Sequence, residues 1–463
     1  MNRLKFWFNR SPRAQRPCVQ IKTRLFCEDP DNSAFKKYNN GLVIYVQQGV
    51  IMHLINIMLA TILAVVVTAC GKNDNVISSS SSSSSASILS SSSLSSNSSA
   101  SVSSGAASST AQVLSAEMDD QIKKIMTQSG ATAATVAVAR NGQIVYEQGY
   151  GFQDVNKSIA TKPDSLMRIG SVNKPITAAA IRKLAEIGLV ALSDHVFCNG
   201  SNAPCWLPSN LLSETSDSRV KDITIQHLIG HQGGWYVDIS GDPFEQEFEI
   251  KSLLQLSGPP TREDIIFHVM KRPLDFVPGL PDYIHRNYSN FGYLLLGMII
   301  EQATHTDYVT HVQTEIMAQL GVSDSDYKTG ASTLLNHDAR EPNYISALIC
   351  PSVFSNGQDA RCSEEGADLK NWLSAGGTIA TAKAMALFAQ HYRLPMDYAD
   401  GYRVIGEPLL SQTYGGGHDG DLPGTTTLLR QLPSGVSYAV FINISYNMEQ
   451  KLGALDRISQ LAP

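Results

Sequence analysis

The sequence has no long basic run, and the formal net charge of its 463 residues is −6. Because nucleic-acid binding depends on clustered lysine and arginine, this composition argues against nucleic acid as the main partner. We therefore expect no nucleic-acid partner, which leaves small or neutral substrates open. Hydrophobic residues make up 43% of the chain, enough for a sizeable core.

Motifs of several common enzyme classes are also missing. The chain has no G-x-S-x-G, so the nucleophile elbow of α/β-hydrolases is not available, and it has no G-x-x-x-x-G-K phosphate loop. His227 and His231 stand four residues apart but without H-E-x-x-H. We expect no metal and no other cofactor. Zinc, held by these histidines or by the cysteines, is the disfavoured alternative.

Residues 52–70, MHLINIMLATILAVVVTAC, have the length and apolar character of a secretory signal. Their VTAC ending resembles a bacterial lipoprotein signal, which implies export and lipidation of Cys70. Gly71 then favours the outer membrane. A short buried helix and an uncleaved anchor are the alternatives, and the usual positive residues before the apolar run are absent. Met52 becomes a candidate true start, with residues 1–51 an extension added by a wrongly assigned start.

Residues 71–110 are dominated by serine and cannot bury enough apolar surface to offset their ordering entropy. We expect a disordered linker there, followed by one folded domain over 111–463. Four cysteines of that domain fall into two local pairs, neither with the C-x-x-C spacing of zinc sites. In an exported protein they predict two short-loop disulfides, although four cysteines allow three pairings. The expected pairs are Cys198–Cys205 and Cys350–Cys362.

The order of periodic segments predicts an α/β fold. An amphipathic helix from Ala111 precedes two strands that flank Asn141-Gly142, a strong hairpin signal. Helical patterns fill most of the middle, and a second strand pair and a helix close the chain. We expect one antiparallel sheet built from both termini, with flanking helices and a mostly helical subdomain. The expected strands are 135–140, 143–151, 425–432 and 436–445, and the last helix is 447–462.

Ser171 and Lys174 stand three residues apart where RIGSVNKPITAAAI enters a helix. Serine is an ordinary helix cap, and S-x-x-K also occurs at Ser218 and Ser325 in polar, loop-like segments. Positions i and i+3 of a helix share a face, however, and burial lowers a lysine pKa toward the neutral form that can accept the hydroxyl proton. This context favours Ser171 as a nucleophile.

Five motifs resemble the serine β-lactamase and penicillin-binding-protein superfamily, in the branch of class C β-lactamases, D-amino-acid peptidases and β-lactamase-fold esterases. They occur in family order over about residues 115–460. The resemblance implies the β-lactamase/transpeptidase-like fold. The five are MRIGSVNKPITAAAI, ITIQHLIGHQGG, the Y-x-N of NYSNFGYLLLG, LSAGGTIAT and GHDGDLPG.

The third catalytic motif has two candidates. Lys328-Thr329-Gly330 matches K-T-G letter for letter but has no strand pattern around it. His418-Asp419-Gly420 leads directly into the last strand pair, where the family places this motif, so we choose His418 and interpret 328–330 as a coincidence. Histidine titrates near neutrality, so we expect weaker or pH-dependent recognition of a substrate carboxylate.

The resemblance implies a role for each matched residue. Ser171 is acylated, while Lys174 and Tyr288 move its proton, and which of the two is the base stays open. His418 and Gly420 bind substrate, and Asn290 binds substrate or positions Lys174 by hydrogen bonds, although Asn290 is also a possible helix cap. The backbone N–H groups of Ser171 and Asp421 form the oxyanion hole.

We expect a serine hydrolase that cleaves an ester or amide of a small acyl substrate, closest to a carboxylesterase or peptidase. A class C-like β-lactamase or D-alanyl-D-alanine carboxypeptidase is the alternative within the superfamily. A non-catalytic, tethered cell-wall-binding or penicillin-sensing protein is the alternative of another class. The expected partners are an ester, D-amino-acid peptide or β-lactam, and a membrane reached through Cys70.

Overall fold

The computed structural model describes residues 102–463 apart from 199, 201–202, 213–215, 281–286, 396–400 and 411–414. It also describes the backbone of three strands nearer the N-terminus, and the chain divides into the units Met1–Ser95 and Ser96–Pro463. The signal 52–70, with Cys70, lies outside the described residues. The three strands form an antiparallel sheet of their own: β1 (Cys18–Ile21), β2 (Arg24–Asp29) and β3 (Asn32–Lys37).

The second unit begins earlier than the sequence predicts. Helix α2 (Val102–Ser129) starts within the serine-rich segment, before Ala111. Extending an existing helix adds one hydrogen bond for each residue fixed, and the alanines among these serines are strong helix formers. The expected linker 71–110 therefore overlaps the first residues of α2, which begins at Val102.

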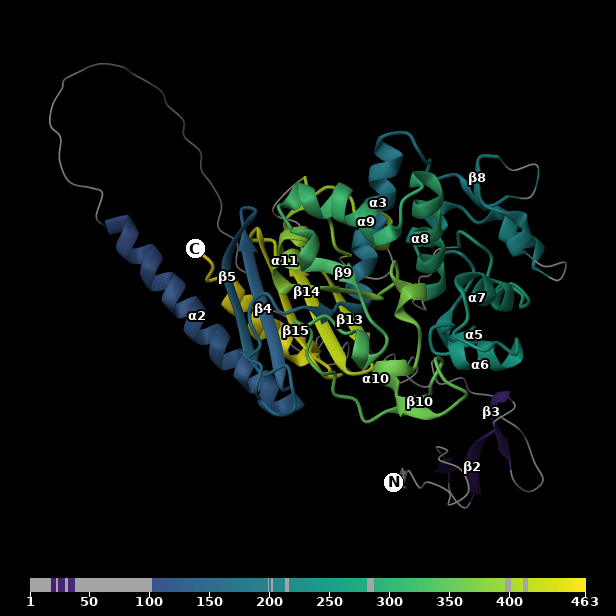
Figure 1. The fold of residues 1–463 in the computed structure, drawn as a ribbon, viewed down its shortest axis with the longest axis horizontal. Coiled ribbons are helices and arrows are strands. Elements are labelled where there is room, and N and C mark those ends of the chain that lie inside the picture. The colour runs from purple at the N-terminus through teal and green to yellow at the C-terminus, as the bar shows by residue number, and fades with distance from the viewer. Residues whose placement is uncertain are drawn as a thin grey trace, which may run out of the picture. The chain divides into compact units, whose positions relative to one another are not determined.

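A five-stranded antiparallel sheet joins the two ends of this unit (Figure 1). Its order is β13-β14-β15-β4-β5, so β15 near the C-terminus pairs with β4 near the start of the domain. The predicted sheet is thus confirmed. Its strands are β4 (Ala133–Arg140), β5 (Gln143–Gly151), β13 (Gly416–Leu422), β14 (Thr425–Gln431) and β15 (Val436–Ile442).

The β4–β5 hairpin turns as its sequence predicts. Asn141 and Gly142 have φ angles of 52° and 72°. Positive φ at both central residues defines a type I′ turn, whose twist matches that of the two strands, and asparagine and glycine adopt it most easily.

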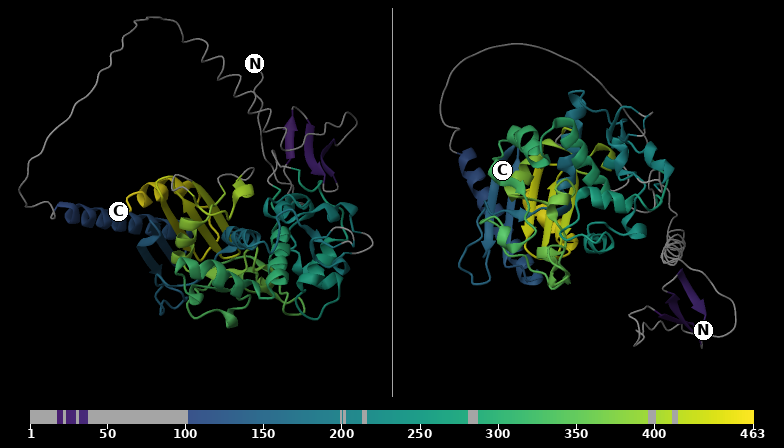
Figure 2. Two further views of the ribbon diagram at one scale, coloured as in Figure 1. Left: turned by 90° about the horizontal axis from the view of Figure 1, so that it is seen from above. Right: turned by 45° about the vertical axis from the view of Figure 1, so that its right-hand side comes forward.

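Helices cover both faces of the sheet, so β15 is buried along its whole length and β4 along all but its last residue. On β15, Ala439 and Phe441 pack with α11 (Ala382–His391), whereas Tyr438 and Val440 pack with α2 and α13 (Leu452–Ser459). Side chains alternate between the faces of a strand, which gives two apolar layers with the sheet between them. Figure 2 shows helices on both sides of the sheet.

The middle of the chain forms the mostly helical part. Its longest helices are α3 (Asn173–Glu186) and α8 (Asn290–Thr304), which pack on each other in the main core. Three short sheets that the periodicity did not indicate also lie here. Their strands are β6 (Met167–Arg168), β12 (Thr378–Ala380) and β9 (Tyr327–Thr329); β7 (His195–Phe197) and β8 (Cys205–Leu207); and β10 (Ile349–Pro351) and β11 (Asp359–Arg361).

Shorter helices complete this part of the fold. They are α4 (Ile225–Ile229), α5 (Val237–Ser240), α6 (Glu247–Leu253), α7 (Arg262–Val269), α9 (Tyr308–Val312), α10 (Cys362–Glu365) and α12 (Gly401–Val404). Within the described part of the chain, no helix combines the length and the hydropathy needed to cross a bilayer.

Two disulfides join cysteines that are close in the sequence. They link Cys198 to Cys205 and Cys350 to Cys362, the two local pairs of the sequence analysis. No group of three or more potential metal ligands forms among the described residues.

Candidate active site

Ser171 lies in a single 3-10 turn, Gly170–Val172, that leads directly into α3. No side chain caps either helix start, so Ser171 is not a helix cap. Gly170 has a φ of 51°, and a Cβ there would lie 3.1 Å from the backbone nitrogen of Asp421. A glycine at this point therefore brings the serine turn close to strand β13.

Asn173, two residues later, anchors the start of α3. Its side chain is fully buried and donates to the Tyr308 hydroxyl and to the backbone oxygen of Leu373. It also accepts hydrogen bonds from Tyr327 and Thr378. Four hydrogen bonds to separate segments fix the turn that carries Ser171.

The Lys174 side chain rises from the first turn of α3 to Ser171. Its Nζ lies 3.0 Å from Ser171 Oγ, 2.6 Å from Asn290 Oδ1 and 2.7 Å from the backbone oxygen of Ala375. Lys174 is completely buried, and this burial lowers its pKa to about 7, against an opposing effect of Asp242. Near neutral pH much of the amine is therefore unprotonated and within reach of the serine proton.

Asn290 connects Lys174 to a carboxylate that the sequence analysis missed. Its Nδ2 donates to Asp242 Oδ2 at 2.5 Å while its Oδ1 faces Lys174. Burial raises the pKa of Asp242, and the hydrogen bond from Asn290 opposes that rise. No motif marks Asp242, which stands in a loop between α5 and α6 and meets Asn290 only through the fold.

The cap at the start of α8 is Ser289 rather than Asn290. Ser289 Oγ accepts a hydrogen bond from the backbone N–H of Gly292. The Asn290 side chain is therefore available for Lys174.

Tyr288 flanks the lysine from the other side. Its ring centroid lies 4.7 Å from Lys174 Nζ, and the ring stacks on His231 at 4.6 Å. Burial lowers the pKa of His231 well below its usual value, and the charge of Lys174 contributes further. Lys174 therefore contacts Ser171 directly, and the Tyr288 ring lies beside the amine.

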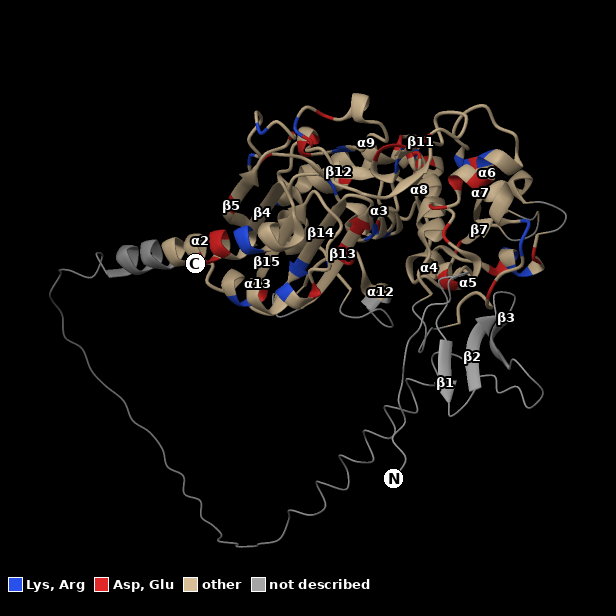
Figure 3. Ribbon diagram, turned by 90° about the horizontal axis from the view of Figure 1, so that it is seen from below, with Lys and Arg blue, Asp and Glu red and all other residues tan. Residues whose placement is uncertain are grey.

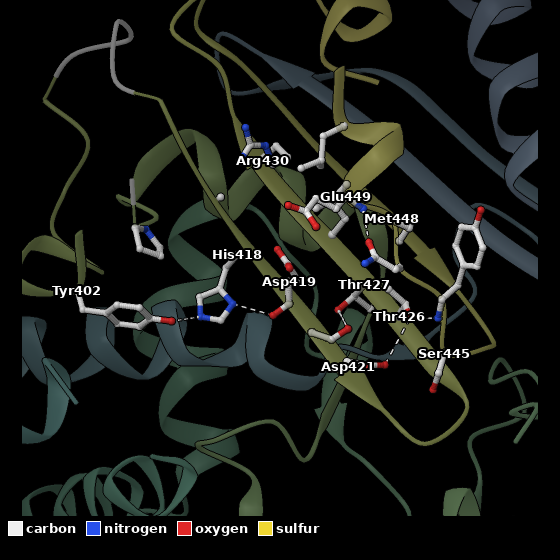
Figure 4. A pocket seen from close by; sticks show the side chains of 17 residues that line it. Tyr402, His418, Asp419, Asp421, Thr426, Thr427, Arg430, Ser445, Met448 and Glu449 are labelled. Atoms are coloured by element: carbon white, nitrogen blue, oxygen red, sulfur yellow. Dashed lines mark hydrogen bonds between the residues drawn. The ribbon is translucent and has the colours of Figure 1, made fainter. Parts of the chain in front are cut away.

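His418 differs from its sequence-based assignment. It is 5% exposed, and its Nε2 lies 2.8 Å from the Tyr402 hydroxyl, while its Nδ1 lies 2.7 Å from the backbone oxygen of Asp419 (Figure 4). Burial, reinforced by the charge of Lys174, lowers its pKa to about 3. The ring is therefore neutral across the physiological range. The sequence-based expectation that it titrates near neutrality is wrong, because His418 is buried.

Asp421 lines two cavities in the described part of the chain. One, of about 340 Å³, contains Ser171, Asn290 and the backbone of Ala375 and Gly376. The other, of about 660 Å³, follows β13 and β14 and includes His418 and Gly420 (Figure 4). The structure thus places Ser171, Asn290 and Asp421 in one cavity, whereas His418 and Gly420 border the other.

The loop with Gly376 and Gly377 closes the back of the serine cavity. A Cβ on Gly376 would lie 2.9 Å from the backbone carbon of Gly170, and one on Gly377 would lie 2.1 Å from the Leu369 oxygen. Both positions require glycine, and this close packing presents the Ala375 oxygen to Lys174.

A profile of the Beta-lactamase family matches residues 118–459. The chain belongs to this family of serine hydrolases. The superfamily predicted from the five motifs is confirmed.

Curated relatives in the Beta-lactamase family match parts of the chain. Penicillin-binding protein 4* of Bacillus subtilis (strain 168) is 29% identical over 41% of this chain and 37% of its own length. Esterase EstB of Burkholderia gladioli is 27% identical over 50% of this chain and 56% of its own. The chain therefore spans roughly a third to a half of these relatives.

Solved structures of the Beta-lactamase family share the fold. D-amino acid amidase from Ochrobactrum anthropi SV3, complexed with L-phenylalanine amide, superposes with a TM-score of 0.52 at 19% identity. The match covers 76% of this chain and 98% of that one. At such identity the likeness concerns the fold alone.

The K-T-G letters of this Beta-lactamase family member lie away from the serine cavity. Contrary to the sequence analysis, Lys328 and Thr329 do belong to a strand, β9, which pairs with β12. Lys328 forms a salt bridge with Asp338 and lines neither cavity beside Asp421.

Proposed function

We propose that this protein hydrolyses an ester or amide of a small acyl substrate through an acyl-enzyme on Ser171, in the manner of an esterase or peptidase. The observation that carries the proposal is the 3.0 Å contact between Ser171 Oγ and Lys174 Nζ, whose pKa burial lowers to about 7. A neutral amine at hydrogen-bond distance is what the serine hydroxyl needs to become a nucleophile near neutral pH.

The same contacts support a full catalytic cycle. Ser171 Oγ attacks the carbonyl carbon while Lys174 takes the hydroxyl proton, and the backbone N–H groups of Ser171 and Asp421 stabilise the oxyanion. The carbon–oxygen or carbon–nitrogen bond to the leaving group then breaks, and the Lys174 ammonium returns the proton to that group. A water molecule, deprotonated by Lys174, then attacks the carbonyl carbon of the acyl-enzyme. The bond from that carbon to Ser171 Oγ breaks, the Lys174 ammonium returns the proton to Oγ, and the acid is released.

Asn290 and Tyr288 position Lys174 in this cycle. The Asn290 amide oxygen holds the amine toward Ser171, and the Tyr288 ring covers it. We assign the base to Lys174 because its nitrogen contacts the nucleophile directly.

A fluorophosphonate probe tests the nucleophile. We expect stoichiometric labelling at Ser171, located by peptide mass spectrometry, and none in Ser171→Ala. Ser325→Ala, at an exposed S-x-x-K serine, is the matched control and should label like the wild type. Labelling that persists in Ser171→Ala removes the mechanism.

Burst kinetics with p-nitrophenyl acetate separate an enzyme from the non-catalytic alternative. A burst followed by turnover supports a hydrolase, a burst alone supports an acylated sensor, and no reaction supports a binding protein. Nitrocefin and a D-alanyl-D-alanine peptide test the β-lactamase and carboxypeptidase alternative. We expect both to be poor substrates, because His418 is buried and neutral and so supplies no charge for a carboxylate.

We also propose that Cys70 is lipidated and anchors the exported protein to the outer membrane. The VTAC sequence and the serine-rich segment after it support this location. Metabolic labelling with a palmitate analogue should mark the wild-type protein and not Cys70→Ser. Equal labelling of both would exclude the anchor.

A further inference from the structure

The cavity beside Ser171 contains three carboxylates. Asp242, Glu245 and Asp421 line it, and its described lining residues include no lysine, arginine or histidine. No described lysine or arginine forms a salt bridge with any of the three, and Lys174, beneath Ser171, acts on the pKa of Asp242 alone among them. The charge of this cavity is therefore negative.

The carboxylates reach the cavity from separate parts of the fold. Asp242 and Glu245 belong to the segment that leads into α6, and Asp421 belongs to the edge strand β13, where Figure 3 shows acidic residues. Burial raises the pKa of Glu245, with a further contribution from Asp242, and burial and Asp419 raise that of Asp421. Among the described residues, no cation stabilises the charge of either carboxylate.

Asp421 departs from the family pattern at this point. In the H-x-G-G-x-P-G ending that GHDGDLPG resembles, Asp421 takes the place of the second glycine. The chain therefore adds a negative side chain at a position whose backbone N–H belongs to the proposed oxyanion hole.

The rest of the wall is apolar and aromatic. Phe244 and Trp372 meet edge to face with ring centroids 5.6 Å apart, and Leu348, Leu422 and Pro423 complete the lining. Aromatic rings attract cations, and the attraction grows when water is excluded. The wall thus suits an organic cation better than a hydrated metal ion.

We propose that this cavity selects substrates that carry a protonated amine and rejects substrates that carry a carboxylate. The inference rests on the proposed hydrolase function and names its substrate class: esters or amides with an ammonium group beside an apolar or aromatic side chain. A carboxylate there would face the charges of Glu245 and Asp421, which no described cation offsets, whereas an ammonium is attracted by both.

Three ligands of similar shape test the preference on the full chain: 2-phenylethylamine, 2-phenylethanol and phenylacetate. Each is titrated by ligand-observed NMR, which needs no turnover, and as a competitor of p-nitrophenyl acetate hydrolysis. We expect the amine to bind about tenfold more tightly than the alcohol and the carboxylate most weakly. Because part of the site is exposed, 0.5 M salt, where screening acts over only about 4 Å, should reduce the preference.

Two substitutions assign the preference to the cavity. Glu245→Gln and Asp421→Gly should each reduce the ratio of amine to alcohol affinity about threefold, since each removes one charge. Glu249→Gln, an exposed glutamate of α6 outside the cavity, is the matched control and should leave the ratio unchanged. Asp421→Gly restores the residue of the family pattern and keeps the backbone N–H.

The outcomes separate the two proposals. Equal or tighter binding of phenylacetate, or a preference that survives both substitutions, overturns the charge selection even if the ester is hydrolysed. Selective amine binding without any hydrolysis leaves the charge selection standing and contradicts the proposed function.

Discussion

Lys174 has two unlike sides. On one side, hydrogen-bonding groups connect it to Ser171, Asn290 and, through Asn290, to Asp242. On the other, the rings of Tyr288 and Tyr293 lie 4.7 and 5.5 Å from its Nζ. The polar side holds a carboxylate that favours the charged amine, whereas the complete burial of Lys174 favours the neutral one. The pKa of about 7 is the balance between the two.

The imidazoles behind the aromatic side strengthen this contrast. His231 packs against Tyr288 and Tyr402, and His418 contacts Tyr402. Burial keeps both rings neutral, and the charge of Lys174 lowers the pKa of each further. Because both histidines are neutral, they fill the space behind the tyrosine rings without adding positive charge beside Lys174.

Removing Lys174 removes the group that both sides act on, so it should have the largest effect on activity. We expect Lys174→Ala to lower kcat/KM for p-nitrophenyl acetate by about a thousandfold or more, because the nucleophile loses its base. Steady-state kinetics, with circular dichroism to verify folding, measure it. A folded variant with less than a tenfold loss would assign the base to another group.

Neutralising the polar side should move the pH profile rather than abolish activity. In the wild type, kcat/KM should rise through a pKa of about 7 as Lys174 loses its proton. Asp242 raises that pKa, so Asp242→Asn lowers it, and the rise should shift to lower pH with a modest change at the plateau. A profile between pH 5 and 9 measures this shift.

Two outcomes of that experiment would count against the polar side. A shift to higher pH would contradict the sign of the Asp242 interaction. If the pH profile of kcat/KM does not shift, the Asp242 charge does not act on the pKa of Lys174. Asp238→Asn, at an exposed aspartate of α5 that does not line the serine cavity, is the matched control.

Weakening the aromatic side should affect stability more than catalysis. Tyr402→Phe removes the hydroxyl that contacts buried His418, which should cost about 1–2 kcal/mol of unfolding free energy. The pH profile should keep its position, since both imidazoles stay neutral. Denaturant unfolding and the same profile measure the two effects. If Tyr402→Phe shifts the pH profile of kcat/KM and leaves the unfolding free energy unchanged, Tyr402 and His418 take part in the proton transfer.

The sequence is sufficient to predict the sheet because its signals are local or periodic. Asn141-Gly142 fixes one hairpin, and alternating apolar residues mark the strands on either side. The pairing of β15 with β4 follows once both ends of the domain are seen to be strands. The start of α2 could not be predicted, because serine and alanine segments continue a helix only when one already exists beside them.

The site could be predicted only where neighbours in sequence are neighbours in space. Ser171 and Lys174 share one turn, so their spacing predicts their contact. Asp242 and Asn290 are 48 residues apart in the sequence, and no local pattern predicts the hydrogen bond between them. His418 was placed by its motif, but its burial depends on Tyr402, which belongs to a separate segment.

The pairing of the first and last strands has a consequence for biogenesis. After Asn290 has been synthesised and before β15 is made, β4 still has one edge without its partner, although Ser171, Lys174 and Asn290 are all present in the chain. Synthesis of β15 is therefore the event that completes the pairing of β4 and closes the sheet. A premature stop before Val436 would yield a chain that contains the whole Ser171, Lys174 and Asn290 set and still lacks the framework to align it.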